Sequence, residues 1–158
     1  MEDLYLKKKS LVTCTLQRAK PEDCELMFRL QKLDGAKINP EDADEVARFE
    51  IYKREFAPSE IQVIYSGTTP VGRLRIVRDE DLYIGGLQIL PEYRGKWIGT
   101  TILERLIEES KETLKSIRLE VFHSNTLAFK LYKKLDFRVI DSNQIQKIMV
   151  YQPMHTDC

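Results

Sequence analysis

The densest group of residues that could do chemistry lies in the middle of the chain. Pro91-Glu92-Tyr93-Arg94-Gly95-Lys96-Trp97-Ile98-Gly99-Thr100 combines two cations with two glycines. Glycines let a backbone approach a ligand closely, and the free N–H groups in the first turn of a helix bind phosphate. Because a helical pattern begins near Ile98, this segment predicts a loop and helix start that bind a phosphate-bearing ligand. The alternative interpretation is a glycine turn with two solvated cations.

The loop motif and the net charge restrict the class of ligand further. The loop lacks both the Gly-Lys-Ser/Thr ending of a P-loop and the G-x-G-x-x-G spacing of a dinucleotide-binding fold. The 158 residues include 25 Lys+Arg and 25 Asp+Glu, so the formal net charge is zero. Domains that bind nucleic acid or anionic membranes usually carry a basic excess. We therefore expect no nucleic acid and no membrane as partner, and a local cationic loop that suits one pyrophosphate.

The chain ends and the cysteines favour a cytoplasmic protein without a metal. The N-terminus runs directly into Lys7-Lys8-Lys9 and is not a secretory signal, and no apolar run approaches the ~20 residues needed to span a bilayer. Cys14, Cys24 and Cys158 fit neither a disulfide framework nor a zinc site. Cys14 lies in an apolar run, which predicts a buried side chain.

Strands and helices must position the central loop. Three successive strand patterns before it predict an antiparallel meander, and Gly85-Gly86 in the third indicates a bulge or a close backbone approach. With no repeats or linkers, we expect one α/β domain over residues 1–158, with an ordered core of about 10–152. Alternation predicts strands at 11–16, 61–65, 71–77, 82–90, 117–122, 137–140 and 145–151, and apolar spacing with end signals predicts helices at 21–34, 39–56, from about 98, and at 125–135.

Two segments in this order resemble the GNAT superfamily of N-acetyltransferases. The central loop is similar to the family's acyl-CoA pyrophosphate pattern, Q/R-x-x-G-x-G/A, with Arg94 at the first position and Gly99 at the last. The run from Leu119 through Asn125, with Ala128, Leu131-Tyr132 and Leu135-Asp136-Phe137 after it, is similar to the family's N-x-x-A-x-x-x-Y followed by Gly-Phe. The order of elements also fits, so the resemblance covers nearly the whole chain. It implies a single-domain GNAT-like fold with four helices and a mixed, mostly antiparallel sheet of about seven strands, splayed where acyl-CoA binds.

Two positions depart from the family pattern. Trp97 stands where the loop usually has Gly, and a bulky residue with positive φ there costs about 1–2 kcal/mol. With ordinary dihedral angles, the indole would instead lie beside the cofactor, and the sequence does not choose between the two. Asp136 replaces the Gly after the last helix, where Asp tolerates a left-handed cap better than most residues.

The resemblance implies transfer of an acetyl group from acetyl-CoA to a primary amine, by direct attack in a ternary complex and without a metal. The backbone of the strand before the loop would pair with the pantetheine arm, and an N–H near Ile89 would polarise the thioester carbonyl. The N–H groups from Gly95 to Thr100 would hold the pyrophosphate, and Asn125 would bind the pantetheine further along. The implied cofactor-binding residues are Leu87, Gln88, Ile89, Arg94, Gly95, Lys96, Trp97, Ile98, Gly99, Thr100 and Asn125.

The resemblance makes Tyr132 the candidate general acid and Glu120 the candidate base. A phenol is protonated at neutral pH and can donate to the leaving thiolate. Tyr132 also lies on an apolar stripe, so the alternative is a core tyrosine. Strand alternation places Glu120 opposite Leu119 and Val121, with a solvent-facing carboxylate as its alternative role. His123 is a second candidate base, ranked below Glu120 because a histidine at a strand end is more often structural.

The acceptor amine implied by the resemblance is a small molecule, a peptide N-terminus or a lysine, held between the first two helices and the last two strands. Acids at residues 41–45 could attract such an amine, but the macrodipole of the helix that they begin explains them better. The main alternative function is a non-catalytic acyl-CoA-binding sensor or interaction module, which Trp97 favours. A further alternative is an interaction domain that has lost cofactor binding. The sequence leaves a monomer and a homodimer equally open.

Overall fold

The structure, a computed structural model, describes residues 13–35 and 44–154. The chain forms two compact units. The first comprises Met1–Arg75 and Gly86–Gly99, and the second comprises Ile76–Gly85 and Thr100–Cys158. Strands β3 and β4 each begin in one unit and end in the other, and each unit buries hydrophobic side chains of its own.

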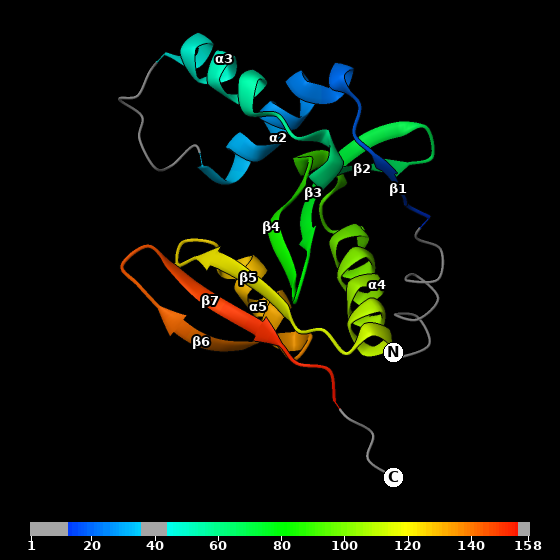
Figure 1. Cartoon of the computed structure of the whole chain (residues 1–158), viewed down its shortest axis with the longest axis vertical. Coiled ribbons are helices and arrows are strands. Elements are labelled where there is room, and N and C mark those ends of the chain that lie inside the picture. The colour runs from blue at the N-terminus through cyan, green and yellow to red at the C-terminus, as the bar shows by residue number, and fades with distance from the viewer. Residues whose placement is uncertain (1–12, 36–43, 155–158) are drawn as a thin grey trace. The chain divides into compact units, whose positions relative to one another are not determined.

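A seven-stranded sheet runs in the order β1-β2-β3-β4-β5-β7-β6 (Figure 1). Strand β4 pairs with β5 in parallel, whereas β1–β2, β2–β3, β5–β7 and β6–β7 are antiparallel. This mixed, mostly antiparallel sheet with four α-helices in the described part of the chain confirms the predicted fold class. The strands are β1 Thr15–Arg18, β2 Ile61–Ser66, β3 Thr69–Arg78, β4 Leu82–Ile89, β5 Ile117–Phe122, β6 Arg138–Ser142 and β7 Gln146–Tyr151.

The elements follow the predicted pattern except near the starts of helix α3 and strand β1. Helix α3 begins at Glu45, and the Asp44 carboxylate caps it by accepting a hydrogen bond from the Ala47 N–H at 3.2 Å. The start predicted near residue 39 lies outside the described residues. The first strand was predicted too early, because its pairing with β2 begins only at Thr15. The helices are α2 Cys24–Gly35, α3 Glu45–Glu55, α4 Ile98–Thr113 and α5 Thr126–Lys134, with short 3-10 turns at Pro21–Asp23, Pro58–Glu60 and Pro91–Tyr93.

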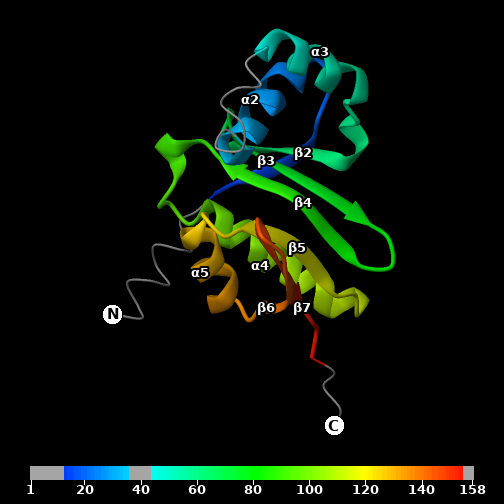
Figure 2. The same ribbon diagram turned by 90° about the vertical axis from the view of Figure 1, so that its left-hand side faces the viewer.

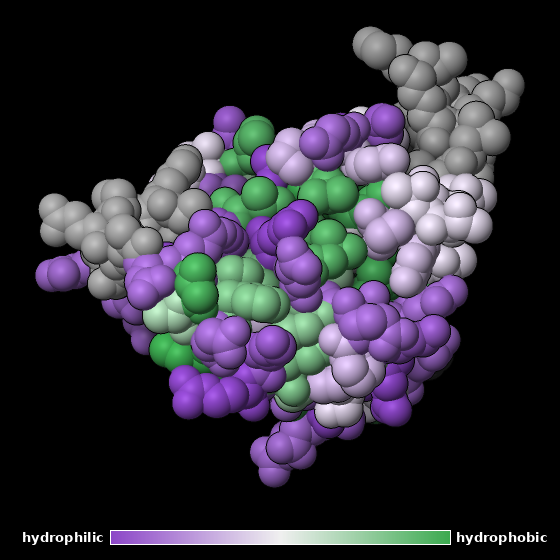
Figure 3. Space-filling view, turned by 90° about the horizontal axis from the view of Figure 1, so that it is seen from above, coloured by the Kyte–Doolittle hydropathy of each residue, from purple (hydrophilic) through white to green (hydrophobic). Residues whose placement is uncertain are grey.

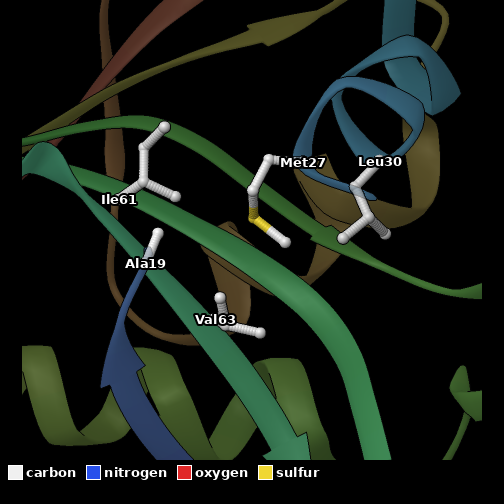
Figure 4. Close-up of a cluster of buried hydrophobic side chains, with 5 residues drawn as sticks. All are labelled: Ala19, Met27, Leu30, Ile61 and Val63. Carbon is white, nitrogen blue, oxygen red and sulfur yellow. The ribbon is translucent and has the colours of Figure 1, made fainter. Parts of the chain in front are cut away.

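In the first unit, α2 packs its apolar stripe on the sheet. Met27 and Leu30 of α2 are fully buried against Val63 of β2, and Figure 4 shows these side chains pointing toward one another. Helices α2 and α3 lie side by side (Figures 1 and 2). Rings join them, because Phe28 lies 5.2 Å from Phe49 and 5.3 Å from Tyr52 between centroids. This packing fixes Tyr52 over the same face of the sheet.

Apolar side chains also remain at the surface. Figure 3, seen from above, shows hydrophobic side chains among hydrophilic ones. In helix α3, Val46 is 72% and Ile51 48% exposed. Cys14, in contrast, is buried as predicted.

In the second unit, α5 lies beside strands β5, β7 and β6 (Figure 2). Strand β5 alternates as predicted, with Leu119 and Val121 buried on one face. Phe137 is almost fully buried, and its ring lies 5.6 Å from that of Tyr132 and 5.7 Å from that of Tyr151. The contacts among these three rings hold α5 against β7.

Asp136 follows α5 with a φ of 70°, as expected for a left-handed cap. Its N–H donates to the Lys133 carbonyl at 3.1 Å, and the Phe137 N–H donates to the Tyr132 carbonyl at 3.0 Å. The chain therefore turns through Asp136 into β6 with the last carbonyls of the helix satisfied.

Substitutions at Asp136 should separate backbone strain from side-chain contacts. We expect Asp136→Gly to raise the free energy of unfolding by about 0.5–1 kcal/mol, because glycine has no Cβ to strain at positive φ. Asp136→Ala should lower it, since alanine tolerates this region less well than aspartate. Urea denaturation followed by circular dichroism measures both changes. Equal stability of the two variants would contradict the left-handed assignment.

Candidate functional site

The chain leaves β4 and enters α4 through a tightly held loop. The Leu90 N–H donates to the Val71 carbonyl at 2.8 Å, and a 3-10 turn over Pro91–Tyr93 follows. The Arg94 Nε then donates back to the Ile89 carbonyl at 3.1 Å. These bonds attach the start of the predicted phosphate loop to the end of β4.

Two residues of this loop have left-handed backbones. Gly95 has a φ of 74° and Trp97 a φ of 67°. The sequence left the conformation of Trp97 open, and the structure shows positive φ, at a strain of about 1–2 kcal/mol for a bulky residue. The tryptophan therefore keeps the backbone that glycine usually provides here. The loop thus keeps its left-handed turn at a cost in backbone strain at Trp97.

Helix α4 begins directly after Trp97. Ile98 is buried and anchors the first turn of this 16-residue helix. The N–H groups of a first helical turn have no partner within the helix, so they are available to an anion. A Cβ added to Gly99 would meet no heavy atom within 4 Å, so the space beside this glycine is open. The segment from Arg94 to Gly99 thus has the donors and the room to hold a phosphate.

Gln88, before the loop, has a role that the sequence reasoning missed. Its side chain is buried, and its Oε1 accepts a hydrogen bond from Nη1 of Arg73 at 2.9 Å. Arg73 lies in β3 and is also buried. A cation within the apolar run around Leu74 and Ile76 was the available signal for this pair.

In the second unit, Glu120 does not simply face solvent. It is half-buried on the face of β5 opposite Leu119 and Val121, and its Oε2 accepts a hydrogen bond from the Tyr83 hydroxyl. The Arg118 guanidinium lies 4.9 Å from the centroid of the Tyr83 ring. Tyr83 was not predicted as a site residue, and its place on β4 beside β5 explains the contact.

His123 is held by the turn between β6 and β7. Its Nε2 lies 2.7 Å from the Asn143 carbonyl oxygen, and its backbone N–H donates to the Ile145 carbonyl at 3.0 Å. A carbonyl only accepts, so Nε2 donates this hydrogen bond. This contact favours the structural role for His123.

Tyr132 lies in α5, and Asn125 directly precedes this helix. The Asn125 Oδ1 caps this helix by accepting from the Ala128 N–H at 3.2 Å. Tyr132 is 9% exposed and packs against Phe137. This burial is what its alternative role as a core residue predicts. Both predicted residues therefore also support the helix itself.

The predicted site residues are divided between the two units. The first unit brings together the end of β4 and the loop from Arg94, and the second holds Tyr83 with Glu120. Within the described residues, no three or more His, Cys, Asp or Glu side chains gather to hold a metal ion. No helix among them is long and apolar enough to cross a membrane.

Comparison with known families decides the identity. The sequence profile of the acetyltransferase (GNAT) family matches residues 17–137. The chain belongs to this family. It is therefore an acyltransferase by membership, and the resemblance seen in its two motifs is confirmed. No curated protein sequence matches the chain significantly.

Solved structures of GNAT acetyltransferases show the same fold. The PaiA N-acetyltransferase of Thermoplasma acidophilum, solved in complex with coenzyme A, is similar with a TM-score of 0.71 and 24% identity, over 89% of this chain and 99% of that one. The ribosomal-protein-S18-alanine N-acetyltransferase of Escherichia coli has a TM-score of 0.67 and 16% identity, over 92% and 97%. Ard1 of Thermoplasma volcanium has a TM-score of 0.66 and 19% identity, over 91% and 100%.

The two glycines of the GNAT loop should respond oppositely to alanine. Neither has a heavy atom within 4 Å of an added Cβ, but only Gly95 has positive φ. We expect Gly95→Ala to lower the free energy of unfolding by about 1 kcal/mol through strain alone. Gly99→Ala should raise it by up to about 1 kcal/mol, since alanine is the better helix former. Urea denaturation measures both, and a Gly95→Ala variant as stable as the wild type would refute the loop conformation.

Proposed function

We propose that this chain transfers an acetyl group from acetyl-CoA to a primary amine by direct attack in a ternary complex. The observation that carries the proposal is the backbone of the loop, where Gly95 and Trp97 both keep positive φ before the first turn of α4. A residue under strain is retained at a site where its conformation has a use. Family membership and a structural neighbour solved with coenzyme A support the same donor.

The donor would be held mainly by backbone groups. The N–H groups from Gly95 to Thr100 would bind the pyrophosphate, with Arg94 and Lys96 adding charge. Lys96 also lies 5.1 Å from the centroid of the Tyr93 ring, which steadies its ammonium on the loop. The backbone of Leu87–Ile89 would pair with the pantetheine arm, while Asn125 would donate to it from its amide group.

The acyl transfer needs a base, an oxyanion donor and an acid. Glu120 would take the proton from the acceptor ammonium on Oε1, directly or through water, because its Oε2 already accepts from Tyr83. The neutral amine then attacks the thioester carbon, and an N–H near Ile89 stabilises the oxyanion. As the C–S bond breaks, Tyr132 would donate its phenolic proton to the leaving thiolate. The attacking nitrogen loses its second proton to solvent, and the Tyr132 phenolate regains a proton from solvent. The products are an amide and coenzyme A.

The acceptor would be a small-molecule amine, a peptide N-terminus or a lysine. One neighbour of the same fold is named a ribosomal-protein-S18-alanine N-acetyltransferase. A peptide amine is therefore one class of acceptor to test. For the location of the protein, the buried thiols of Cys14 and Cys24 support the cytoplasm.

Removing the Tyr132 hydroxyl should separate catalysis from binding. We expect Tyr132→Phe to lower kcat by about 10–100-fold by removing the acid, while the packing of the ring is kept. Acetyl-CoA should still change the fluorescence of Trp97, the only tryptophan, and still raise Tm. Thiol release with a panel of amines measures kcat.

The matched control for Tyr132 is Tyr151→Phe. Tyr151 is equally buried and contacts the same Phe137 ring, but it has no assigned role. Its variant should turn over as the wild type does. If Tyr132→Phe also keeps full turnover, Tyr132 is a core residue only. If acetyl-CoA binds and no amine releases thiol, the chain is an acyl-CoA-binding module instead.

Replacing Glu120 should remove the acid limb of the pH–rate profile. A carboxylate base works only when deprotonated, so kcat/KM of the wild type should rise with pH and then level. We expect Glu120→Gln to lower kcat/KM about a hundredfold on the plateau and to lose that limb. Tyr83→Phe should keep the limb and lower kcat/KM less than Glu120→Gln does, because it removes only the hydrogen bond to Oε2. An unchanged profile in Glu120→Gln would assign the base elsewhere.

A further inference from the structure

Strand β6 is an open edge of the sheet. The strand order ends with β7 and β6, so within residues 13–35 and 44–154 only one side of β6 pairs with another strand (Figure 1). The backbone N–H and C=O groups on the other side of an edge strand are available to another chain. All five residues of β6 are exposed, whereas its neighbour β7 buries Met149 and Tyr151. Strand β6 is therefore a surface to which a further strand can be added.

The hairpin of β6 and β7 also exposes β-branched apolar side chains. Val139 is 41%, Ile140 62% and Ile145 58% exposed. Valine and isoleucine favour strands, and an exposed apolar edge strand is a site of pairing between chains. Many edge strands are protected from such pairing by charges or a bulge, and β6 carries both charges, Arg138 and Asp141. The arrangement of these two charges determines whether they oppose pairing or specify it.

A bulge in β6 sets this arrangement. Val139 of β6 lies opposite Met149 of β7. Asp141 lies opposite Ile148, the next residue along β7. Ile140 is thus one extra residue in β6, and the register of the strand shifts at this point.

The shifted register places both charges of β6 on one face of the sheet. Arg138 lies opposite Val150, and Asp141 lies opposite Ile148. Val150 and Ile148 are two residues apart in β7, so their side chains share a face, and their partners in β6 share it too. Without the bulge, the three-residue separation of Arg138 and Asp141 would place them on opposite faces.

The charges of β6 are complementary to those of a second, antiparallel β6. A two-fold axis between the bulges of two copies would place Arg138 of each copy opposite Asp141 of the other, on the same face. A two-fold interface repeats every contact, so both ion pairs would form. Val139 and Ile140 of the two copies would lie between these pairs. Opposite charges and β-branched side chains facing each other across two strands both stabilise the pairing.

We propose that β6 is a homodimer interface, at which two copies of the chain pair antiparallel along this edge. The occupant is a second copy because the order basic, apolar, apolar, acidic over residues 138–141 matches its own reverse, charge against opposite charge. The two sheets would then continue into each other across the two-fold axis. The inference is independent of the proposed function, since β6 holds no residue assigned to the donor or to proton transfer.

The first test is the oligomeric state of the wild-type chain. Sedimentation velocity from micromolar to millimolar concentration should show a monomer that converts to a dimer as concentration rises. A chain that stays monomeric at the highest concentration would overturn the proposal. The charges and the bulge of β6 would then be protection of an edge strand.

Charge reversal tests the pairing itself. Arg138→Asp and Asp141→Arg each place like charges opposite each other twice, so we expect each to raise the dissociation constant of the dimer at least about tenfold. An equimolar mixture of the two variants has opposite charges at both contacts and should form a heterodimer with about the wild-type affinity. A mixture that stays monomeric, or single variants that dimerise as the wild type does, would refute the proposed pairing.

An apolar substitution and a matched control complete the test. Ile140→Lys should weaken the dimer, because it places two ammonium groups near the two-fold axis. Leu127→Lys adds the same charge on α5, where Leu127 is 81% exposed, and should leave the dimer unchanged. Circular dichroism and Tm report that each variant is folded, and where Ile140→Lys does not fold, the mixture of charge variants decides. Equal weakening by Leu127→Lys would contradict an interface at β6.

Discussion

The site depends on one backbone constraint, the passage from β4 into α4. Between Ile89 and Ile98 the chain must end a strand, make a 3-10 turn and start a long helix. Positive φ at Gly95 and Trp97 makes that passage possible, and the bond from Arg94 to the Ile89 carbonyl holds it. The helix start exposes its donors because the residues before it turn away in left-handed conformations. The strain at Trp97 is acceptable because the turn determines where α4 begins.

Strand β4 has a second function besides leading into the loop. Near its start, Tyr83 donates to Glu120, and near its end, Gln88 accepts from Arg73. In both contacts a charged side chain is held by a neutral one. In the proposed mechanism Glu120 handles the proton of the acceptor. Strand β4 thus positions one charged side chain in each unit.

Much of the fold could be predicted from the sequence, because periodic patterns determine most helices and strands. The alternation of β5, the stripe of α4 and the start of a helix near Asn125 were predicted from local rules, and the left-handed Asp136 from its place after a helix. The contacts of Arg73 and of Tyr83 were missed, because they join residues 15 and 37 positions apart. The conformation of Trp97 was also undecided, since tertiary packing outweighs the intrinsic preference of a bulky residue. Local sequence predicts elements, and partners across the sheet require the structure.

The close approach of Arg73 to Gly86 also constrains how this protein can evolve. An added Cβ at position 86 would lie 2.3 Å from Nη1 of Arg73, so a side chain there must displace the guanidinium or be accompanied by a shorter residue at position 73. The two positions should therefore change together among relatives, with glycine accompanying arginine and larger residues accompanying smaller ones. Where the pair has changed, the hydrogen bond from Arg73 to Gln88 would change while the loop before α4 remains. Covariation of these two positions would thus mark relatives in which the buried side chains of β3 and β4 pack differently.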